Sequence, residues 1–355
     1  MPRSEPHVPG TIEVREALRF DTEAIERYMS ANVEGFEGRI SVRQFEGGQS
    51  NPTYHLSAGV NEYVLRRKPP GKLLPSAHLV EREYRIISAL AGTSVPVPRA
   101  HVLCEDPSVI GTAFYIMDYV PGRVFREPRL PGLAPAERRA IYDDMANVLA
   151  KLHRVDWQAL GLADFGRPGN YFARQIRRWT EQYRASETET ISSMERLITW
   201  LPAHIPEDDQ TTIVHGDFRL ANMIVHPTEP RIVAVLDWEL ATLGHPLSDL
   251  AYACMPYRLG AQLFEGLAGQ NLGDLAIPSE EEFVAAYCRT AGPATIPYWE
   301  FYLAFAMFRL AAILQGITGR VRAGTAAASD ARARGAMARP MADAAWTVAT
   351  ARGAN

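Results

Sequence analysis

The pattern of hydrophobic and polar positions changes character about one third of the way along the chain. In the first third, apolar and polar residues alternate in short segments bounded by Gly, Pro, Asn and Ser, which favours strands. Strands are expected over residues 40–45, 53–56, 62–67 and 114–120. Two helices are expected among them, within 12–32 and over 78–91, where apolar residues recur at spacings of three and four.

The remaining two thirds favour helices. Residues 134–154 carry one continuous apolar face that includes Ile141, Met145 and Leu152. The other expected elements are helices at 192–201 and through most of 247–317, and short strands at 213–214, 223–225 and 232–236. Strands followed by helices indicate an α+β fold. We expect a strand-rich N-terminal lobe over 1–118 and a mostly helical C-terminal lobe over 119–355.

Composition narrows the class of protein. The 355 residues are 47% hydrophobic and 22% charged, with a net charge of −4, which gives no reason to expect a nucleic-acid partner. The N-terminus has no apolar run typical of a secretory signal, and three scattered cysteines suit a reducing compartment. The apolar stretch 301–308 is shorter than the roughly 20 residues of a membrane-spanning helix. We therefore expect a cytoplasmic protein without a membrane partner; oligomeric state is unknown from sequence.

The most informative segment is residues 215–222, His-Gly-Asp-Phe-Arg-Leu-Ala-Asn. An Asp with an Asn five residues later matches the kinase catalytic loop. Phosphoryl transfer needs a carboxylate near the acceptor hydroxyl and an oxygen ligand for Mg²⁺ on the same rigid loop, roles that suit Asp217 and Asn222. Asp237 ends the strand expected at 232–236 and suits the metal that bridges the phosphates. Alternatively, Asp217 and Asp237 are turn or capping carboxylates.

These segments resemble a known family. HGDFRLANMIV, VLDWE and PLSDLAY are similar to motifs of the aminoglycoside phosphotransferase and choline kinase family. EYVLRRKPPGKLLPSAHLVEREYRII and YIMDYVPGR especially resemble the kinase-like half of certain fusion acyl-CoA dehydrogenases and their free-standing bacterial relatives. The resemblance covers about residues 35–320. It implies a two-lobed, protein-kinase-like fold that uses ATP and Mg²⁺.

The resemblance also implies roles for individual residues. Asp217 is expected to be the catalytic base, and Asn222 and Asp237 are expected to be magnesium ligands. His215 is expected to hydrogen-bond the backbone rather than transfer protons. Arg219, next to the reaction centre, is expected either to hold charge on the substrate or transition state or to form a structural pair.

A glycine-containing turn precedes the third expected strand. Gly47, Gly48, Ser50 and Asn51 lie in the connection between two strands, where backbone N–H groups reach phosphate oxygens in many nucleotide sites. Ser50 adds a hydroxyl donor. The turn departs from the protein-kinase G-x-G-x-x-G pattern, so an ordinary hairpin is the alternative.

The third strand carries the candidate phosphate clamp. Val64, Arg66 and Lys68 share one face of the strand, because side chains alternate with a period of two. Val64 is expected on the adenine side and Arg66 at the phosphates, where protein kinases use Lys. Lys68 is the alternative clamp, and a solvated basic strand end is a second alternative. Glu83, on the following helix, is the expected partner of the clamp; its competitor is Glu81.

The segment after residue 116 is the expected hinge between the lobes. Backbone groups of Met117, Asp118, Tyr119 and Val120 are expected to hydrogen-bond adenine. Asp249 is expected to brace the catalytic loop rather than take part in chemistry.

Together these features predict an ATP-dependent phosphotransferase that moves the γ-phosphate to a hydroxyl of a small molecule. The resemblance suggests a hydroxyacyl-CoA as acceptor, with an aminoglycoside-type antibiotic kinase as an alternative. Two other classes are a catalytically dead nucleotide-binding module and a two-carboxylate hydrolase. Arg66 in place of Lys leaves the catalytically dead module as a possible class. Such a module, however, has no need of Asp217, Asn222 and Asp237. The hydrolase hypothesis assigns no role to Asn222.

The arginine-rich segment 319–339 is expected to be a mobile basic loop or a frayed helix. If the acceptor is an acyl-CoA, its phosphates need cations separate from those that hold ATP. Arg320 and Arg322 are candidates, because Arg suits bidentate contacts with phosphate.

Overall fold

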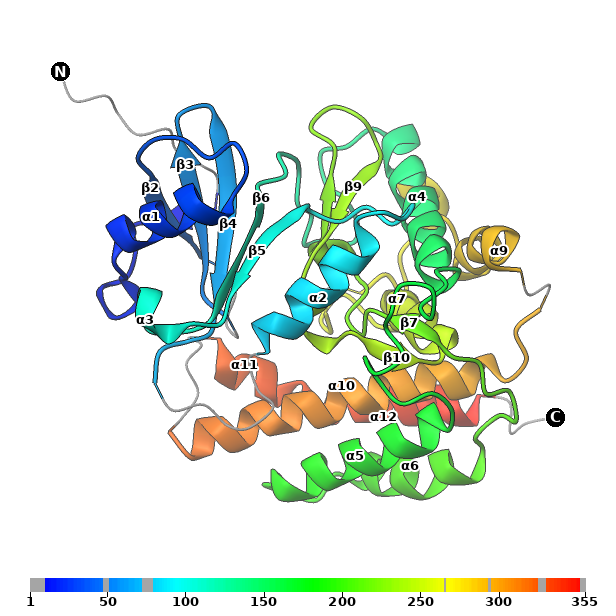
Figure 1. The fold of residues 1–355 in the computed structure, drawn as a ribbon. Coiled ribbons are helices and arrows are strands. Elements are labelled where there is room, and N and C mark those ends of the chain that lie inside the picture. The colour runs from blue at the N-terminus through cyan, green and yellow to red at the C-terminus, as the bar shows by residue number, and fades with distance from the viewer. Residues whose placement is uncertain are drawn as a thin grey trace. The chain divides into compact units, whose positions relative to one another are not determined.

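The computed structural model describes residues 10–46, 51–71, 79–264, 266–292, 295–324 and 330–351. The chain forms two compact units. The first contains residues 1–121 together with 236–239, and the second contains 122–235 and 240–355. The first unit is rich in strands and the second is mostly helical, which confirms the α+β expectation (Figure 1).

An antiparallel sheet forms the centre of the first unit. Its strands are β1 (Thr11–Ile12), β2 (Ser41–Phe45), β3 (Thr53–Ala58), β4 (Asn61–Arg67), β5 (Ala100–Cys104) and β6 (Phe114–Asp118). They lie in the order β1-β2-β3-β4-β6-β5. The register pairs Arg66 of β4 with Thr53 on one side and Tyr115 on the other. Arg66 therefore projects from the middle of the sheet rather than from an edge.

Helices cover the sheet of the first unit. They are a 3-10 helix (Glu16–Leu18), α1 (Thr22–Asn32), α2 (Val80–Leu90) and the short α3 (Pro107–Ile110). α1 begins at Asp21, whose carboxylate accepts a hydrogen bond from the Ala24 N–H at 3.0 Å. Its buried residues Ile25 and Met29 join strand residues such as Leu65 in one core. α2 packs against β5 and β6.

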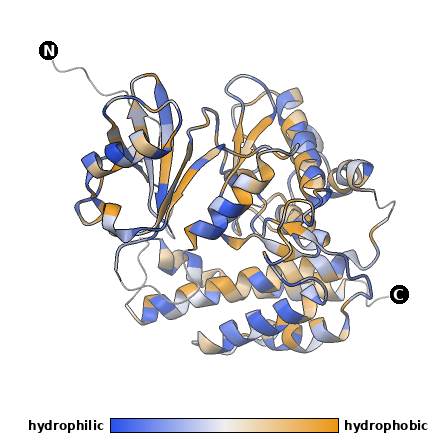
Figure 2. Cartoon of the chain, viewed as in Figure 1, coloured by the Kyte–Doolittle hydropathy of each residue, from blue (hydrophilic) through white to orange (hydrophobic). Residues whose placement is uncertain are grey.

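The second unit is built around one long helix. Its helices are α4 (Pro135–His153), α5 (Tyr171–Ala185), α6 (Ser192–Ala203), α7 (Pro246–Arg258), α8 (Leu272–Leu275), α9 (Glu280–Ala291), α10 (Trp299–Arg322), α11 (Ala331–Ala336) and α12 (Ala338–Thr350). α10 packs against α5, α7, α11 and α12, and α4 packs against α9. α5 is amphipathic and buries Ile176, Trp179 and Tyr183, so it shows hydrophilic and hydrophobic faces (Figure 2).

α10 alone, among the described residues, is long and apolar enough to cross a membrane. Of its most apolar window, 78% is buried inside the protein, and every residue from Phe301 to Phe308 is buried. The expectation that residues 301–308 form a core helix is therefore confirmed.

Four short strands support the loops of the second unit. β7 (Thr212–Val214) pairs antiparallel with β10 (Thr242–Gly244), and β8 (Met223–Val225) pairs with β9 (Ile232–Val235). Two 3-10 helices, Leu220–Asn222 and Trp238–Leu240, follow closely on β7 and β9. These pairings fix the ends of the segment from residue 215 to 222.

The structure departs from the sequence expectations in several places, since β5, α3 and β10 were not expected. α5 was not expected, because four strongly polar arginine and glutamate residues lie between its buried positions. The segment 319–339 was expected to be a loop or frayed helix, and that is wrong for its described residues. α10 continues through Arg322, and α11 occupies 331–336. Alanine, which is frequent in this segment, favours helix. Gly335 packs tightly against α10, and a Cβ at position 335 would lie only 2.4 Å from Thr318 Oγ1.

Candidate active site

The catalytic-loop segment follows β7, and a buried carboxylate accepts hydrogen bonds from its backbone. Asp249, in the first turn of α7, accepts hydrogen bonds from the His215 N–H at 2.5 Å and the Gly216 N–H at 2.8 Å. Gly216 has a φ of +83°, and a Cβ there would come within 2.8 Å of the Leu240 carbonyl oxygen. Asp249 therefore braces the loop, as expected, and only glycine fits at position 216 of the loop.

A buried histidine contacts the bracing carboxylate. His153 Nε2 lies 3.6 Å from Asp249 Oδ2, and His153 Nδ1 shares a 2.7 Å hydrogen bond with the Tyr287 hydroxyl. Burial alone would raise the pKa of Asp249, but His153, His215 and the Gly216 N–H outweigh burial and lower that pKa. The carboxylate is therefore held ionised, which keeps it an acceptor for the loop.

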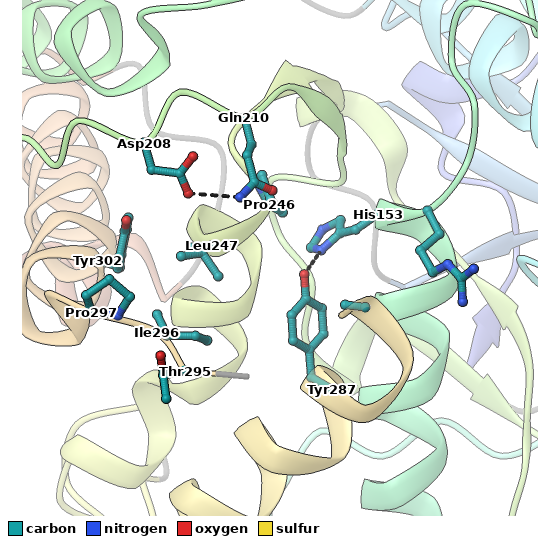
Figure 3. Close-up of a pocket in the computed structure, with 12 residues that line it drawn as sticks. His153, Asp208, Gln210, Pro246, Leu247, Tyr287, Thr295, Ile296, Pro297 and Tyr302 are labelled. Carbon is teal, nitrogen blue, oxygen red and sulfur yellow. Dashed lines mark hydrogen bonds between the residues drawn. The ribbon is translucent and has the colours of Figure 1, made fainter. Parts of the chain in front are cut away.

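Figure 3 shows a cavity that His153 and Tyr287 line together with residues from α7 and α10. Asp208 also lines it and accepts a hydrogen bond from Gln210 Nε2 at 2.9 Å. His153 thus forms part of the cavity wall and also places its Nε2 beside Asp249.

Asp217 and Asn222 lie on the braced loop and contact each other. Asn222 Nδ2 donates to Asp217 Oδ2 at 2.7 Å and to the Asp217 carbonyl at 2.9 Å. Arg219 Nε lies 3.2 Å from Asp217 Oδ2. Both of these contacts use the side-chain nitrogen of Asn222. His215 Nδ1 accepts the Asp217 N–H at 3.1 Å, which confirms its backbone-binding role.

A second group of charged residues gathers in the first unit around Arg66. Arg66 Nε lies 2.8 Å from Glu83 Oε2, and Arg66 Nη2 lies 2.7 Å from Asp237 Oδ1. Glu239 is farther away, at 3.7 Å from the same nitrogen. Asn51 Nδ2 donates to Glu83 Oε1 at 2.8 Å. Arg66 therefore contacts Asp237, an expected metal ligand, and also Glu83, which in turn contacts Asn51.

Because Arg66 and Glu83 are buried, the charge of each depends strongly on the other. Only 1% of the Glu83 side chain and 11% of the Arg66 side chain are exposed. Burial opposes the charge on Arg66, but Glu83, Tyr115 and Asp237 outweigh burial and raise its pKa. The guanidinium therefore stays charged and needs its carboxylate partners.

The alternative cation on the same strand has a different partner. Lys68 Nζ lies 2.8 Å from Glu81 Oε1, and both side chains are more exposed, at 23% and 30%. The two cations of β4 therefore take the two glutamates of α2 separately. The expected pairing of Arg66 with Glu83 is present, and Glu81 competes for Lys68 instead.

Asp237 has an unusual backbone conformation. Its φ is +66°, a region that residues with a side chain rarely adopt. Such strain persists only where the surrounding structure fixes it, and it often marks functional sites. The left-handed turn directly after β9 lets the Asp237 carboxylate reach Arg66.

The other residues expected to bind ATP are placed as follows. Gly47, Gly48 and Ser50 lie outside the described residues. Val64 is buried and stands opposite Met117 in the register of β4 and β6. Asp118 Oδ1 lies 2.6 Å from His101 Nε2, and the Tyr119 N–H donates to the Glu62 carbonyl.

A further cavity adjoins the catalytic loop, within the second unit. Arg219, Leu220 and Ala221 of the loop line one part of it. Most other lining residues are apolar or aromatic: Tyr142, Met145, Tyr252, Met255, Leu259, Phe264, Leu267 and Leu310. Arg126 is the other charged residue in the lining, and no Asp or Glu is among the described residues that line it.

Tyr252 is the residue of this cavity that sequence reasoning missed. Burial and then the Asp217 charge raise the pKa of the Tyr252 hydroxyl, although Tyr252 lies 35 positions further along the chain. The available signal was its place one helical turn after Asp249, in the segment PLSDLAY, which puts it on the same side of α7.

Comparison with known proteins agrees with this geometry. The model of the "Phosphotransferase enzyme family" matches residues 41–305, about three quarters of the chain. A candidate aminoglycoside phosphotransferase from Ralstonia eutropha JMP134 has a crystal structure that is 53% identical, with a TM-score of 0.87, and the match covers 94% of this chain and 99% of that one.

More distant solved structures share the fold. A thermostable mutant of aminoglycoside phosphotransferase APH(4)-Ia, crystallised in a ternary complex with ADP and hygromycin B, is 18% identical with a TM-score of 0.60, covering 94% of this chain and 99% of that chain. At this identity the likeness concerns the fold alone, and it confirms the kinase-like architecture.

Two curated relatives are named as members of the acyl-CoA dehydrogenase family. Acyl-CoA dehydrogenase family member 10 of Mus musculus is 48% identical over 98% of this chain, and family member 11 of Homo sapiens is 41% identical over 96%. The chain spans only 33% and 45% of their respective lengths. The family match, the structural likeness and the Asp217–Asn222 loop agree, and this chain belongs to the phosphotransferase enzyme family.

Proposed function

We propose that this protein transfers the γ-phosphate of Mg·ATP to a hydroxyl group of a small molecule. The observation that carries the proposal is the loop in which Asp217 and Asn222 lie 2.7 Å apart, braced at two backbone N–H groups by Asp249. Such a loop places a proton acceptor and an oxygen ligand for a cation on one rigid segment, which is what phosphoryl transfer requires. The reduced cysteines and the use of ATP suit the cytoplasm.

Asp217 acts as the base in this proposal. It accepts the proton of the acceptor hydroxyl as that oxygen bonds to the γ-phosphorus, and the bond from phosphorus to the β,γ-bridging oxygen breaks, which releases ADP. Arg219 lies 3.2 Å from Asp217 and is 47% exposed, so it is able to meet charge that develops on the transferred group.

The first unit holds the nucleotide. Arg66 contacts the phosphates and Glu83 orients it, while backbone N–H groups of Gly47 and Gly48 and the Ser50 hydroxyl contribute from the turn. Asn51 supports this arrangement through Glu83, which it contacts at 2.8 Å.

Adenine lies against Val64 and Met117 in this proposal. It hydrogen-bonds backbone groups of the hinge, residues 118–120. The Asp118 and Tyr119 N–H groups already donate to the Arg99 and Glu62 carbonyls. Adenine therefore has to use the remaining carbonyls and the Val120 N–H.

Mg²⁺ fits the oxygen donors present. The Asn222 carbonyl oxygen and the Asp237 carboxylate are hard ligands that Mg²⁺ prefers, and the phosphates and water supply the others. Among the described residues, no group of three or more His, Cys, Asp or Glu side chains is placed to hold a metal ion. When bound, Mg²⁺ neutralises charge on the transferring phosphate.

For the acceptor we propose a hydroxyacyl thioester of coenzyme A. Two relatives are named acyl-CoA dehydrogenases, although those names say nothing of kinase activity. The cavity beside the catalytic loop has the apolar walls that an acyl chain needs, and Arg126 and Arg219 suit anions. A polycationic aminoglycoside would want carboxylates, and no described residue of that lining supplies one.

The cations for coenzyme A phosphates differ from those expected in segment 319–339. Arg334 lies 2.8 Å from Asp330, Arg339 lies 2.7 Å from Glu189, and Arg322 donates to the Thr188 carbonyl. Through these contacts the arginines bind other residues of the chain. Arg126, which is exposed and lines the cavity, is the better candidate for an anion on the acceptor.

The test is a screen for ADP release from Mg·ATP with 4-hydroxyacyl-CoA, the matching free hydroxy acid and an aminoglycoside. Turnover with the thioester, reduced by Arg126→Ala through a higher KM, is expected. Equal efficiency on acid and thioester removes coenzyme A but leaves the kinase. Binding of Mg·ATP with no turnover on any hydroxylated acceptor supports the nucleotide-binding module instead, and no binding of Mg·ATP removes both.

A further inference from the structure

A buried cation in the second unit has no counter-ion among the described residues. Arg309 lies near the middle of α10, and only 6% of it is exposed. Within the described part of the chain it forms no ion pair and donates no hydrogen bond. Asp249, the buried carboxylate of α7, accepts the His215 and Gly216 N–H groups instead. Arginine keeps its charge at every working pH, and a buried charge without a counter-ion is costly.

Two aromatic rings hold the guanidinium in place. Its central carbon lies 5.5 Å from the centroid of the Trp179 ring on α5 and 5.7 Å from that of the Tyr252 ring on α7. The Trp179 Nε1–H donates to Gln175 Oε1 at 3.1 Å, which fixes the orientation of that ring. The ring quadrupoles attract the cation and offset part of its desolvation. The five N–H donors of the guanidinium nevertheless lack an oxygen acceptor among the described residues.

This cation lies against the wall of the cavity beside the catalytic loop. Tyr252 lines that cavity, and so does Leu310, the residue that follows Arg309 on α10. Burial and then the Asp217 charge raise the pKa of the Tyr252 hydroxyl, whereas the Arg219 and Arg309 charges lower it, so all three charges act on one hydroxyl. The cavity has a volume of about 80 Å³. A single water needs roughly 10–15 Å³, so there is room for a group of a ligand.

We propose that Arg309 is an anion subsite for the acceptor and binds a carboxylate or phosphate that the hydroxylated molecule carries. This inference rests on the proposed function, because its ligand is the acceptor of that reaction. A guanidinium binds either group through two parallel hydrogen bonds, and the anion supplies the missing counter-charge. No Asp or Glu is among the described residues that line the cavity, so none of them repels an anion.

Burial gives Arg309 a different task from Arg126. The exposed Arg126 acts through solvent, which screens its charge. An interaction between Arg309 and an anion is screened much less, because Arg309 is 6% exposed. Arg309 should therefore discriminate more strongly between a charged acceptor and an uncharged one of the same shape.

The test compares Arg309→Met with Arg178→Met in the full chain. Arg178 is the matched control, because it is exposed and its guanidinium lies 5.6 Å from the centroid of the same Trp179 ring. The ligands are a free 4-hydroxy acid, its uncharged methyl ester, the matching 4-hydroxyacyl-CoA, and inorganic phosphate as a probe. Binding is measured by calorimetry without ATP at constant ionic strength, and folding is measured by urea unfolding.

We expect Arg309→Met to weaken the acid or the thioester roughly tenfold or more, the size of lost hydrogen bonds between charged groups, and to leave the methyl ester unaffected. Arg178→Met should bind every ligand as the wild type does. A loss confined to the acid identifies a carboxylate, and a loss confined to the thioester identifies a phosphate of coenzyme A. Inorganic phosphate should raise the urea midpoint of the wild type and of Arg178→Met, but not that of Arg309→Met.

Equal affinities in Arg309→Met and Arg178→Met overturn the proposal, as does an equal loss for the acid and its methyl ester. Failure of the acid, the thioester and phosphate all to bind the wild type overturns it as well. Should Arg309→Met not fold, Arg309→Lys keeps the charge without the planar fork and should show a smaller loss of the same pattern. ADP release from Mg·ATP is measured separately. Arg309-dependent binding without ADP release removes the kinase and leaves the anion subsite, so the two failures are distinguishable.

Discussion

Arg66 and Lys68 offer a matched test of how the first unit holds phosphate. Each cation lies on β4 or directly after it, and each has a nitrogen 2.8 Å from a glutamate on α2. They differ in burial and in number of partners, since Arg66 also contacts Asp237 at 2.7 Å. Arg66→Met and Lys68→Met remove one charge each and keep similar side-chain length. Any difference between the two variants therefore reports the surroundings and not the loss of a cation.

The structure gives the expected magnitudes. Removing one partner of a buried ion pair costs roughly 3–5 kcal/mol, because the remaining charge stays buried and uncompensated. Arg66→Met leaves Glu83, only 1% exposed, with Asn51 as its nearest polar partner. Lys68→Met breaks a partly exposed pair, for which roughly 0–1 kcal/mol is typical. We expect the first variant to lower the free energy of unfolding several times more than the second.

The measurements are urea unfolding without nucleotide and titration with Mg·ATP. Arg66→Met should also weaken Mg·ATP at least tenfold more than Lys68→Met does. Adding Glu83→Gln should restore part of the stability lost in Arg66→Met, because the buried charge is then gone. Equal stability losses in the two single variants would refute the burial argument. A larger loss of Mg·ATP affinity in Lys68→Met would move the phosphate clamp to Lys68.

Three further predictions concern the base, the metal and pH. Asp217→Asn should bind Mg·ATP normally and unfold at the wild-type urea midpoint, yet lose at least roughly 10²-fold in turnover, measured as ADP release; wild-type turnover would exclude Asp217 as base. Asp237→Ala should reduce the Mg²⁺-dependent part of ATP affinity more than Asn222→Ala does, because a carboxylate also neutralises charge; calorimetric titrations giving the opposite order would contradict the ligand assignment. Burial lowers the pKa of His245 from 6.5 to about 4, so the unfolded chain takes up that proton first as pH falls. Stability should drop by about 3 kcal/mol between those values, and His245→Asn should flatten the drop; an unchanged slope would show that His245 is not its source.

The catalytic loop could be predicted because its chemistry is local in sequence. Asp217 and Asn222 are five positions apart, and their contact at 2.7 Å follows from one turn of 3-10 helix after a strand. The choice of Glu83 over Glu81 came from the spacing in the family that the chain resembles, and the structure places Glu83 at Arg66. In each case the partners lie in the same or adjacent elements, where periodicity limits what side chains can meet.

Contacts that depend on tertiary packing could not be predicted. The Asp217 charge influences the Tyr252 pKa because Asp249 ties α7 to the loop, and the Arg309 guanidinium lies 5.7 Å from the Tyr252 ring because α10 packs on α7. No single-sequence pattern encodes which face of one helix lies on another. The helices in the described part of 319–339 could not be predicted for the same reason, since a basic loop and a basic helix face packed on carboxylates have the same composition.

The arginine at position 66 is compatible with catalysis, although it stands where protein kinases carry Lys. A planar guanidinium directs its donors along fixed, divergent lines, so Nε bonds Glu83 while Nη2 bonds Asp237. Mg²⁺ and Arg66 would compete for the Asp237 carboxylate, and a divalent cation with phosphate ligands should win that competition. Arg66 would then keep its Glu83 contact through Nε and turn Nη2 to a phosphate oxygen. In this way the ion pair would hold the Asp237 carboxylate, with its positive φ, until the nucleotide arrives.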